Sequence, residues 1–230
     1  MHDHDADLSA GGVRFRRMTM DWPGPDVLWA RIAVSEALSA AAFDGSSDLA
    51  DSLDGVRDGR ISSEDGAGNW FTIIRYPDSR AILFGHDEDS SFWQQAYDPL
   101  ADAPPWVRSA DLTSDHARID HDSEVTFVRW WDGSGWNWSE IVGDDGAVSG
   151  LQNTADPVRY GSEIDVLADE AGWIPDDEND DPEETVTDSE HLEALCEAAD
   201  RGALTGEFFE FLDADQPAVI EYLTAAGVLG

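Results

Sequence analysis

The spacing of apolar residues predicts two helices near the start of the chain. Residues 24–43 carry apolar side chains at spacings of seven, four and three, which is typical of one helical face. These side chains are Val27, Val34, Leu38 and Ala41. Asp26 follows Pro25 and is expected to cap this helix. A shorter helix is predicted over residues 46–56, where Leu49, Leu53 and Val56 form one stripe.

Next along the chain, the spacing of the apolar residues changes from that of a helix to the two-residue period of β-strands. Residues 60–89 predict three strands joined by the turn sequences DGAG and PDSR. A two-residue loop at Asp78 and Ser79 is expected to place Ile74 opposite Leu83, and Ile73 opposite Ile82. Both faces of this hairpin are apolar, so we expect it inside a sheet that is covered on each side, on one side by the first helix.

A tryptophan-rich stretch, VRWWDGSGWNWSE (128–140), predicts a further hairpin. With Gly133 supplying a positive φ in the turn, Trp131 pairs with Trp136, and Arg129 faces Trp138 with a cation–π contact. One face would then collect six side chains: Val125, Phe127, Arg129, Trp131, Trp136 and Trp138.

Two interpretations of this face remain open. It can pack on the core, as cross-strand aromatic pairs often do. Alternatively it can be an exposed aromatic platform for a sugar, a base or a partner's side chains, because Arg129 at its centre requires water or an anion. We favour a mostly buried hairpin in which one or two tryptophans reach the surface.

The C-terminal part of the chain predicts helices around an acidic linker. A helix is expected over 161–173, followed by residues 176–190, which hold nine acids. Thr187 and Glu190 form a capping-box pattern that leads into a helix from His191. Two more short helices are expected, one after Thr205 and one after Asp215 that ends with Gly227 as its cap. They either dock on the main domain or form an independent unit.

The sequence therefore predicts an α+β protein: an antiparallel sheet of hairpins covered by an N-terminal helix, with a small C-terminal helical segment. Its expected organisation is a flexible tail over 1–17, a core domain over 18–175, an acidic linker over 176–190, and a short helical unit over 191–230.

Charge narrows the classes of partner. The chain has 50 acidic residues against 13 arginines, no lysine, and a formal net charge of −37. Such a chain repels nucleic acid and anionic membranes, so we expect neither as a direct partner. With 41% hydrophobic residues and ten tryptophans it is nevertheless expected to fold. Its natural partners are cations, basic proteins, or a site that normally receives nucleic acid.

The expected compartment is the cytoplasm. A single cysteine, Cys196, allows no internal disulfide, and neither a signal peptide nor a membrane span is recognisable. Cys196 is predicted to lie mid-helix, where neighbouring acids raise the pKa of its thiol; this disfavours a nucleophilic role.

Candidate chemistry is weak along the whole chain. His86 beside Asp87, Glu88 and Asp89 could perform acid–base work, and the loop with His116 and His121 could bind a metal loosely, but acidic composition explains both equally well. Common nucleotide, hydrolase, zinc and calcium signatures are absent from the sequence. We predict no catalytic residue, metal site or cofactor.

Two stretches carry a resemblance to other proteins. PDVLWARIAVSEALSAAAF and GNWFTIIRYPDSRAILFGHDEDSSFW resemble a group of acidic proteins of high-GC actinobacteria, over roughly residues 20–106. That resemblance implies no activity. In general style the chain is also similar to acidic immunity proteins that neutralise basic toxins, a likeness that rests on charge and architecture.

Four functions are compatible with these observations: an inhibitor of a basic protein effector (a toxin or nuclease), a nucleic-acid mimic, an acidic protein adapted to salt without a specific partner, and an enzyme that uses His86 or the His116/His121 loop. We favour the first, an immunity- or antitoxin-like binding protein. The expected contact residues are Asp87, Glu88, Asp89, Asp176, Asp177, Glu178, Asp180, Asp181, Arg129, Trp136 and Trp138.

Overall fold

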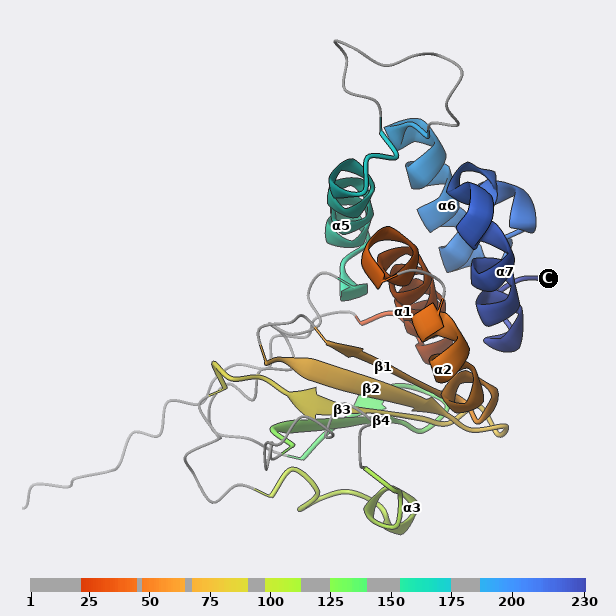
Figure 1. Ribbon diagram of the computed structural model, residues 1–230. Coiled ribbons are helices and arrows are strands. Elements are labelled where there is room, and N and C mark those ends of the chain that lie inside the picture. The colour runs from red at the N-terminus through yellow and green to blue at the C-terminus, as the bar shows by residue number, and fades with distance from the viewer. Residues whose placement is uncertain are drawn as a thin grey trace, which may run out of the picture.

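The α+β prediction is confirmed by a computed structural model of the chain (Figure 1). It describes residues 22–44, 47–64, 68–90, 98–112, 125–139, 154–174 and 187–230. The predicted tail over 1–17 lies outside these residues. None of the described helices is long and apolar enough to cross a membrane.

The described strands form one antiparallel sheet in which neighbours in sequence are neighbours in space, in the order β1-β2-β3-β4-β5. The three strands predicted over residues 60–89 are therefore confirmed as β1, β2 and β3. The strands are β1 (Arg60–Glu64), β2 (Trp70–Arg75), β3 (Ala81–His86), β4 (Phe127–Trp131) and β5 (Trp136–Asn137).

The predicted register of the β2–β3 hairpin is wrong by one residue. Ile74 pairs with Ile82, and Ile73 pairs with Leu83. The loop contains three residues instead of two, because Tyr76 N–H donates to the carbonyl of Arg80 at 2.9 Å and Ser79 takes a left-handed conformation with φ of 65°. An additional loop residue shifts every pair along the hairpin.

The tryptophan hairpin has the predicted turn. Trp131 pairs with Trp136, and Gly133 has φ of 99°. Arg129 lies 5.4 Å from the ring centroid of Trp138, so the predicted cation–π contact is also confirmed. The predicted face is wrong at Val125 and Trp138, however. Both pack with the apolar cluster on the side of the sheet opposite Phe127 and Trp136, because Val125 precedes β4 and Trp138 follows the end of β5 at Asn137.

Helices α1 (Pro25–Ser39), η1 (Ala40–Asp44, a π-helix) and α2 (Ser47–Arg57) follow the predicted positions. The expected cap by Asp26 is wrong, because Gly24 holds the cap position and no side chain bonds there. The Asp26 carboxylate instead accepts a bond from Arg75 at 2.6 Å, which ties the start of α1 to the sheet.

The remaining helices are α3 (Pro105–Arg108), α5 (Pro157–Glu170), α6 (Ser189–Arg201), η3 (Gly206–Asp215, a 3₁₀-helix) and α7 (Gln216–Ala225). The predicted capping box is wrong by one residue: Asp188, not Thr187, caps α6 by accepting from the His191 N–H at 2.8 Å. Gly227 follows α7 with φ of 67°, as expected of a left-handed cap.

The helices cover the two faces of the sheet unequally. Helices α1, α2, α5, α6 and α7 lie on one side, and α3 lies on the other (Figure 1). On the larger side α1 is central, and the C-terminal helices share one apolar cluster with it and with Ile73 and Leu83 of the sheet. The Trp29 indole N–H donates to the carbonyl of Ala226 at 2.9 Å. The C-terminal helices are thus packed on the core.

Gly85 in β3 has no room for a side chain. A Cβ atom there would lie 2.6 Å from the Phe127 ring and would also clash with the Trp70 carbonyl. We expect Gly85→Ala to lower the free energy of unfolding by about 1–3 kcal/mol, since overpacking displaces backbone. Urea unfolding would measure this, with Gly161→Ala as the control: Gly161 lies in α5 with open space around its Cα. The control should be neutral or stabilising, and equal stabilities of the two variants would contradict the close approach.

Candidate functional site

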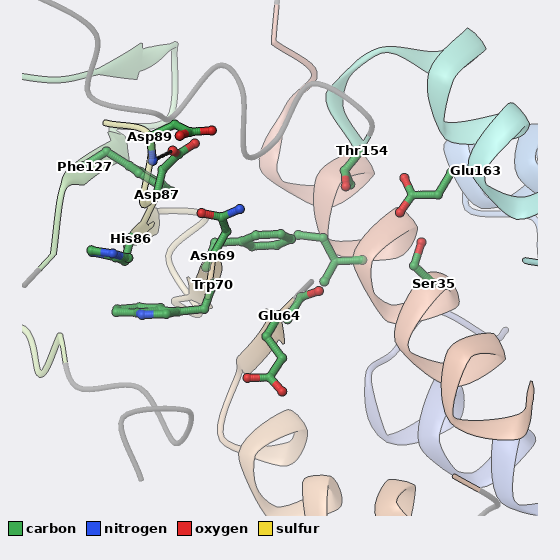
Figure 2. A pocket seen from close by; sticks show the side chains of 13 residues that line it. Ser35, Glu64, Asn69, Trp70, His86, Asp87, Asp89, Phe127, Thr154 and Glu163 are labelled. Carbon is green, nitrogen blue, oxygen red and sulfur yellow. Dashed lines mark hydrogen bonds between the residues drawn. The ribbon is translucent and has the colours of Figure 1, made fainter. Parts of the chain in front are cut away.

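A cleft of about 250 Å³ lies at one end of the sheet, between the strands and two helices. At this end β1 and β3 finish and β2 and β4 begin, because the strands are antiparallel and Glu64 pairs with Trp70, which pairs with His86. Figure 2 shows the sheet side of the cleft facing the helical side. The cleft is lined by Ile32, Ser35, Ser63, Glu64, Asn69, Trp70, Phe71, His86, Asp87, Asp89, Phe127, Thr154 and Glu163.

The turn after β3 forms the acidic edge of the sheet side. Asp87 N–H donates to the Thr126 hydroxyl at 3.1 Å, and the Asp87 carboxylate accepts from the Asp89 N–H at 2.8 Å. The Glu88 N–H donates to the side-chain oxygen of Asn69 at 2.9 Å. These bonds fix the turn to the residue before β4 and to the residue before β2. Short polar side chains that bond to backbone two residues on are typical of such turns.

This turn divides the predicted contact residues into two kinds. Asp87 is 4% exposed, so its carboxylate holds the turn together and presents little surface to a partner. Glu88 and Asp89 are exposed. The expectation that all three acids form a contact surface therefore needs correction at Asp87, since a carboxylate that accepts a local N–H is no longer directed outward.

The helical side of the cleft is built by α1 and α5. Ile32 and Ser35 come from one face of α1, Glu163 comes from α5, and Thr154 lies just before α5. Asp156 caps α5 by accepting from the Val158 N–H at 2.9 Å, which fixes where the helix begins and so where Glu163 lies. Glu163 is exposed at the rim.

Behind this wall, Glu36 of α1 sits in an unfavourable electrostatic environment. Burial raises the pKa of Glu36 to about 7, the Ser63 side chain lowers it through a hydrogen bond, and the carboxylates of Glu64 and Glu163 raise it further. Partial burial of its carboxyl group likewise raises the pKa of Glu163, although the residue as a whole is exposed. Acids from α1, β1 and α5 thus converge at this end of the molecule, where additional negative charge is disfavoured and positive charge is favoured.

The predicted residues of the tryptophan hairpin do not line the cleft. Arg129 is 6% exposed and covered by Trp138, which rules out an open platform centred on it. Trp136 is partly buried, and its indole N–H donates to the carbonyl of Pro23 at 2.9 Å. Trp22 packs against it edge-on at 6.2 Å. The hairpin therefore anchors the chain before α1, and Trp136 and Trp138 remain only partly accessible.

Other predicted candidates lie outside the described residues. These are the acids Asp176, Asp177, Glu178, Asp180 and Asp181 and the two histidines His116 and His121. Within the described part of the chain, no group of three or more His, Cys, Asp and Glu side chains is arranged to hold a metal ion.

Burial, reinforced by Asp200, raises the pKa of the Cys196 thiol to about 12. This agrees with the expected direction of the shift, and it leaves the thiol protonated and unreactive.

Sequence reasoning missed most of the cleft. Glu64, Asn69 and Glu163 lie on three different segments, and only Glu64 and Asn69 carried a local signal, as polar residues flanking the DGAG turn. Ser35 and Glu163 are helix residues whose surroundings depend on how α1 and α5 pack. In a chain with 50 acids, single carboxylates do not stand out.

Comparison of the chain with protein-family models, with curated proteins and with solved structures gives no match. The chemistry of the described residues is therefore the basis for a function. The cleft presents carboxylates, an apolar floor and one histidine, which suits binding of a positively charged group better than bond-making chemistry.

Proposed function

We propose that the protein is a non-catalytic acidic binding protein that docks on a basic protein effector, in the manner of an immunity protein or antitoxin. The observation that carries this proposal is a formal net charge of −37 on a chain that folds around an apolar core. Such a charge distribution attracts a basic partner over long range and accelerates its association.

The arginines do little to offset this charge locally. Arg31, Arg75 and Arg80 already pair with Asp200, Asp26 and Asp78 at 2.6–2.7 Å. Glu64, Asp89 and Glu163 are exposed acids that line the cleft, and no arginine is among the described residues that line it. This end of the molecule is therefore one described surface that suits cationic side chains.

A basic protein should be captured from host lysate at low salt and released at high salt. Raising the salt from about 0.1 M to about 1 M shortens the Debye length from about 10 Å to about 3 Å, so long-range attraction is lost. The captured protein would then be purified, and its association rate with the full chain measured at both salt concentrations.

A steep fall of the association rate with salt, together with inhibition of the partner's activity, is the expected outcome. The matched control is a chain in which exposed acids that do not line the cleft, such as Glu193 and Glu197, are replaced by glutamine. Capture of no basic protein at low salt, with stability that rises steeply as salt is added, would instead favour an acidic protein adapted to salt.

A further inference from the structure

We propose that the basic effector docks on the outward side of α5, where Val158 and Val166 form an apolar centre that acidic side chains surround. Together with Phe43 of η1, these valines make up the α5 face. The inference rests on the proposed function and names both the docking surface and the partner surface that fits it, an apolar side chain flanked by lysine or arginine. Three features support it: grouped apolar side chains, an acidic rim, and acids in the last turn of α5.

Exposed apolar side chains are grouped on this side of the molecule. Among the residues that the structure describes, three large apolar side chains are more than half exposed: Phe43 at 57%, Val158 at 76% and Val166 at 57%. Val158 and Val166 belong to α5, and Phe43 belongs to η1, which packs against α5. Single exposed apolar residues are ordinary on a protein surface, whereas a group of them indicates an interaction site.

The helical geometry directs both valines away from the core. The side of α5 that packs on the core consists of Tyr160, Ile164 and Ala168, which are all buried. Val158 and Val166 precede Tyr160 and Ala168 by two positions, and two positions correspond to a rotation of about 200° around a helix. The valines therefore lie on the opposite side of the helix. Figure 1 shows α5 at the edge of the helical layer, beside α1 and α6.

Acidic side chains form the rim of the α5 face. Glu163, Asp169 and Glu170 are exposed, and none of them pairs with an arginine within the described part of the chain. Arg159 is the one basic residue in the sequence of α5. An apolar centre with a charged rim is the usual arrangement of a protein interface, and the negative sign of this rim selects a basic partner. A second copy would bring two acidic rims together on chains of −37 each, so it fits this face poorly.

The last turn of α5 gives independent support for a basic partner. Asp169 and Glu170 lie in this turn, which contains no basic residue. The carbonyl groups at a helix C-terminus carry a partial negative charge, so acids there destabilise the helix and cations stabilise it. Lysine or arginine side chains of a partner would offset this repulsion. Local residue choices that oppose the stability of the fold are typical of functional sites.

The first test titrates a synthetic basic peptide into the full-length ¹⁵N-labelled protein. The ordered peptide consists of leucine and lysine arranged so that a helix carries all leucines on one side, and a second peptide of the same composition has its leucines dispersed. We expect saturable shifts of the amide signals of Phe43, Val158, Ser162 and Val166. The dispersed peptide should bind about fivefold more weakly, because it presents no apolar side to the valines. Shifts centred on another surface, or equal affinities of the two peptides, would overturn the inference.

The Val158→Ser/Val166→Ser variant removes the apolar centre and keeps the net charge, and serine has nearly the helix propensity of valine. It should bind the ordered peptide about tenfold more weakly, since two apolar contacts are lost. The matched control is Ala203→Ser/Ala214→Ser, which changes exposed apolar residues outside the α5 face. Equal affinities of the valine variant and this control would contradict an apolar docking centre.

The Asp169→Asn/Glu170→Gln variant tests the acidic rim. It should weaken binding of the ordered peptide about fivefold, since two carboxylates next to the bound lysines are lost. It should also be at least as stable in urea as the wild type, because these acids destabilise the end of the helix, and unfolding would then not explain the loss. Glu207→Gln/Glu210→Gln has the same net charge and changes exposed acids of η3, which packs on α7. Equal weakening in both variants would show a response to net charge alone and would overturn the rim.

Binding of the captured effector separates this inference from the proposed function. If the valine variant binds the purified effector as tightly as the wild type does, the effector docks elsewhere and the α5 face is wrong. If no basic protein is captured although the ordered peptide binds at the α5 face, the proposed effector is wrong. Dimerisation of the wild type in sedimentation equilibrium, abolished in the valine variant, would assign the face to a second copy and would also overturn the inference.

Discussion

Replacing Arg31 with methionine should lower the free energy of unfolding by about 3 kcal/mol, among the largest single losses that we expect in this chain. Arg31 is 3% exposed in the middle of α1. Its guanidinium donates two bonds to the Asp200 carboxylate, both at 2.7 Å, and two to the carbonyls of Thr154 and Ala155 at 2.8 and 2.9 Å. It also lies 5.3 Å from the centroid of the Tyr160 ring.

The physical reason is that one side chain joins three helices. Without Arg31, two buried carbonyls before α5 lose their donors and the Asp200 carboxylate of α6 loses its counter-charge. The Asp200 side chain is 31% exposed and can regain some water, which is why the lower end of the range for buried pairs applies. Methionine retains much of the apolar stem, so the loss reports mainly the polar bonds.

Chemical unfolding of Arg31→Met measures the loss, and Arg201→Met is the matched control. Arg201 pairs with Glu197 on the exposed surface of α6, where such pairs contribute about 0.3–0.5 kcal/mol. An Arg31 variant no less stable than the Arg201 variant would show that the buried bonds are energetically neutral. Loss of α5 and α6 protection in hydrogen exchange would further locate the effect.

The elements of the fold were predictable because their signals are local. Period-two alternation and Gly-containing turns determine the hairpins, and Gly133 was enough to set the Trp131–Trp136 pair. The errors in loop length and helix capping arose where the sequence is compatible with two neighbouring local structures. Ser79 adopts a left-handed conformation that serine rarely takes, which lengthened one loop by a residue. Asp188 and Thr187 are both good caps, and tertiary packing buries Thr187.

The cleft and the Arg31 contacts were not predictable, because both depend on which segments meet in three dimensions. Arg31 lies within an otherwise apolar stretch of α1, and its partner Asp200 is 169 residues away. Glu163 of α5 lies on the same cleft as residues of β1, β2, β3 and β4, which come from distant parts of the chain. A sequence with many acids gives no indication of which carboxylates converge. Because acidic residues are so abundant, Asp87 was also assigned to a contact surface, although its side chain is buried in a turn.

Because acids from α1, β1 and α5 lie close together, we expect the free energy of unfolding to depend on pH through Glu36. Burial raises the pKa of Glu36 from 4.5 to about 7, and the nearby carboxylates of Glu64 on β1 and Glu163 on α5 add to this. Tyr222 of α7 completes its surroundings, since the Glu36 charge contributes to the raised pKa of that phenol. In the unfolded chain the same carboxyl group has its ordinary pKa, so folding takes up a proton between these two values.

The sign of the effect follows from proton linkage. Between about pH 4.5 and about pH 7 the folded state binds more protons than the unfolded state, so the free energy of unfolding falls as pH rises. A shift from 4.5 to about 7 corresponds to at most about 3 kcal/mol, at 1.36 kcal/mol per pKa unit. The contribution of Glu36 is therefore complete below about pH 4.5, and it is lost as pH rises through about 7.

Glu36→Gln should remove this dependence, because glutamine resembles the protonated acid, keeps a donor and an acceptor for Ser63, and cannot ionise. Urea unfolding at about pH 5 and about pH 8 measures the difference: the variant should match the wild type closely at the lower pH and exceed it by up to about 3 kcal/mol at the higher. Glu193→Gln, at an exposed position on α6, controls for the change in net charge and should retain the wild-type slope. A Glu36 variant whose stability parallels that of the wild type at both pH values would show that the Glu36 carboxyl is solvated in the folded protein, and that the acids of α1, β1 and α5 do not act as one electrostatic group.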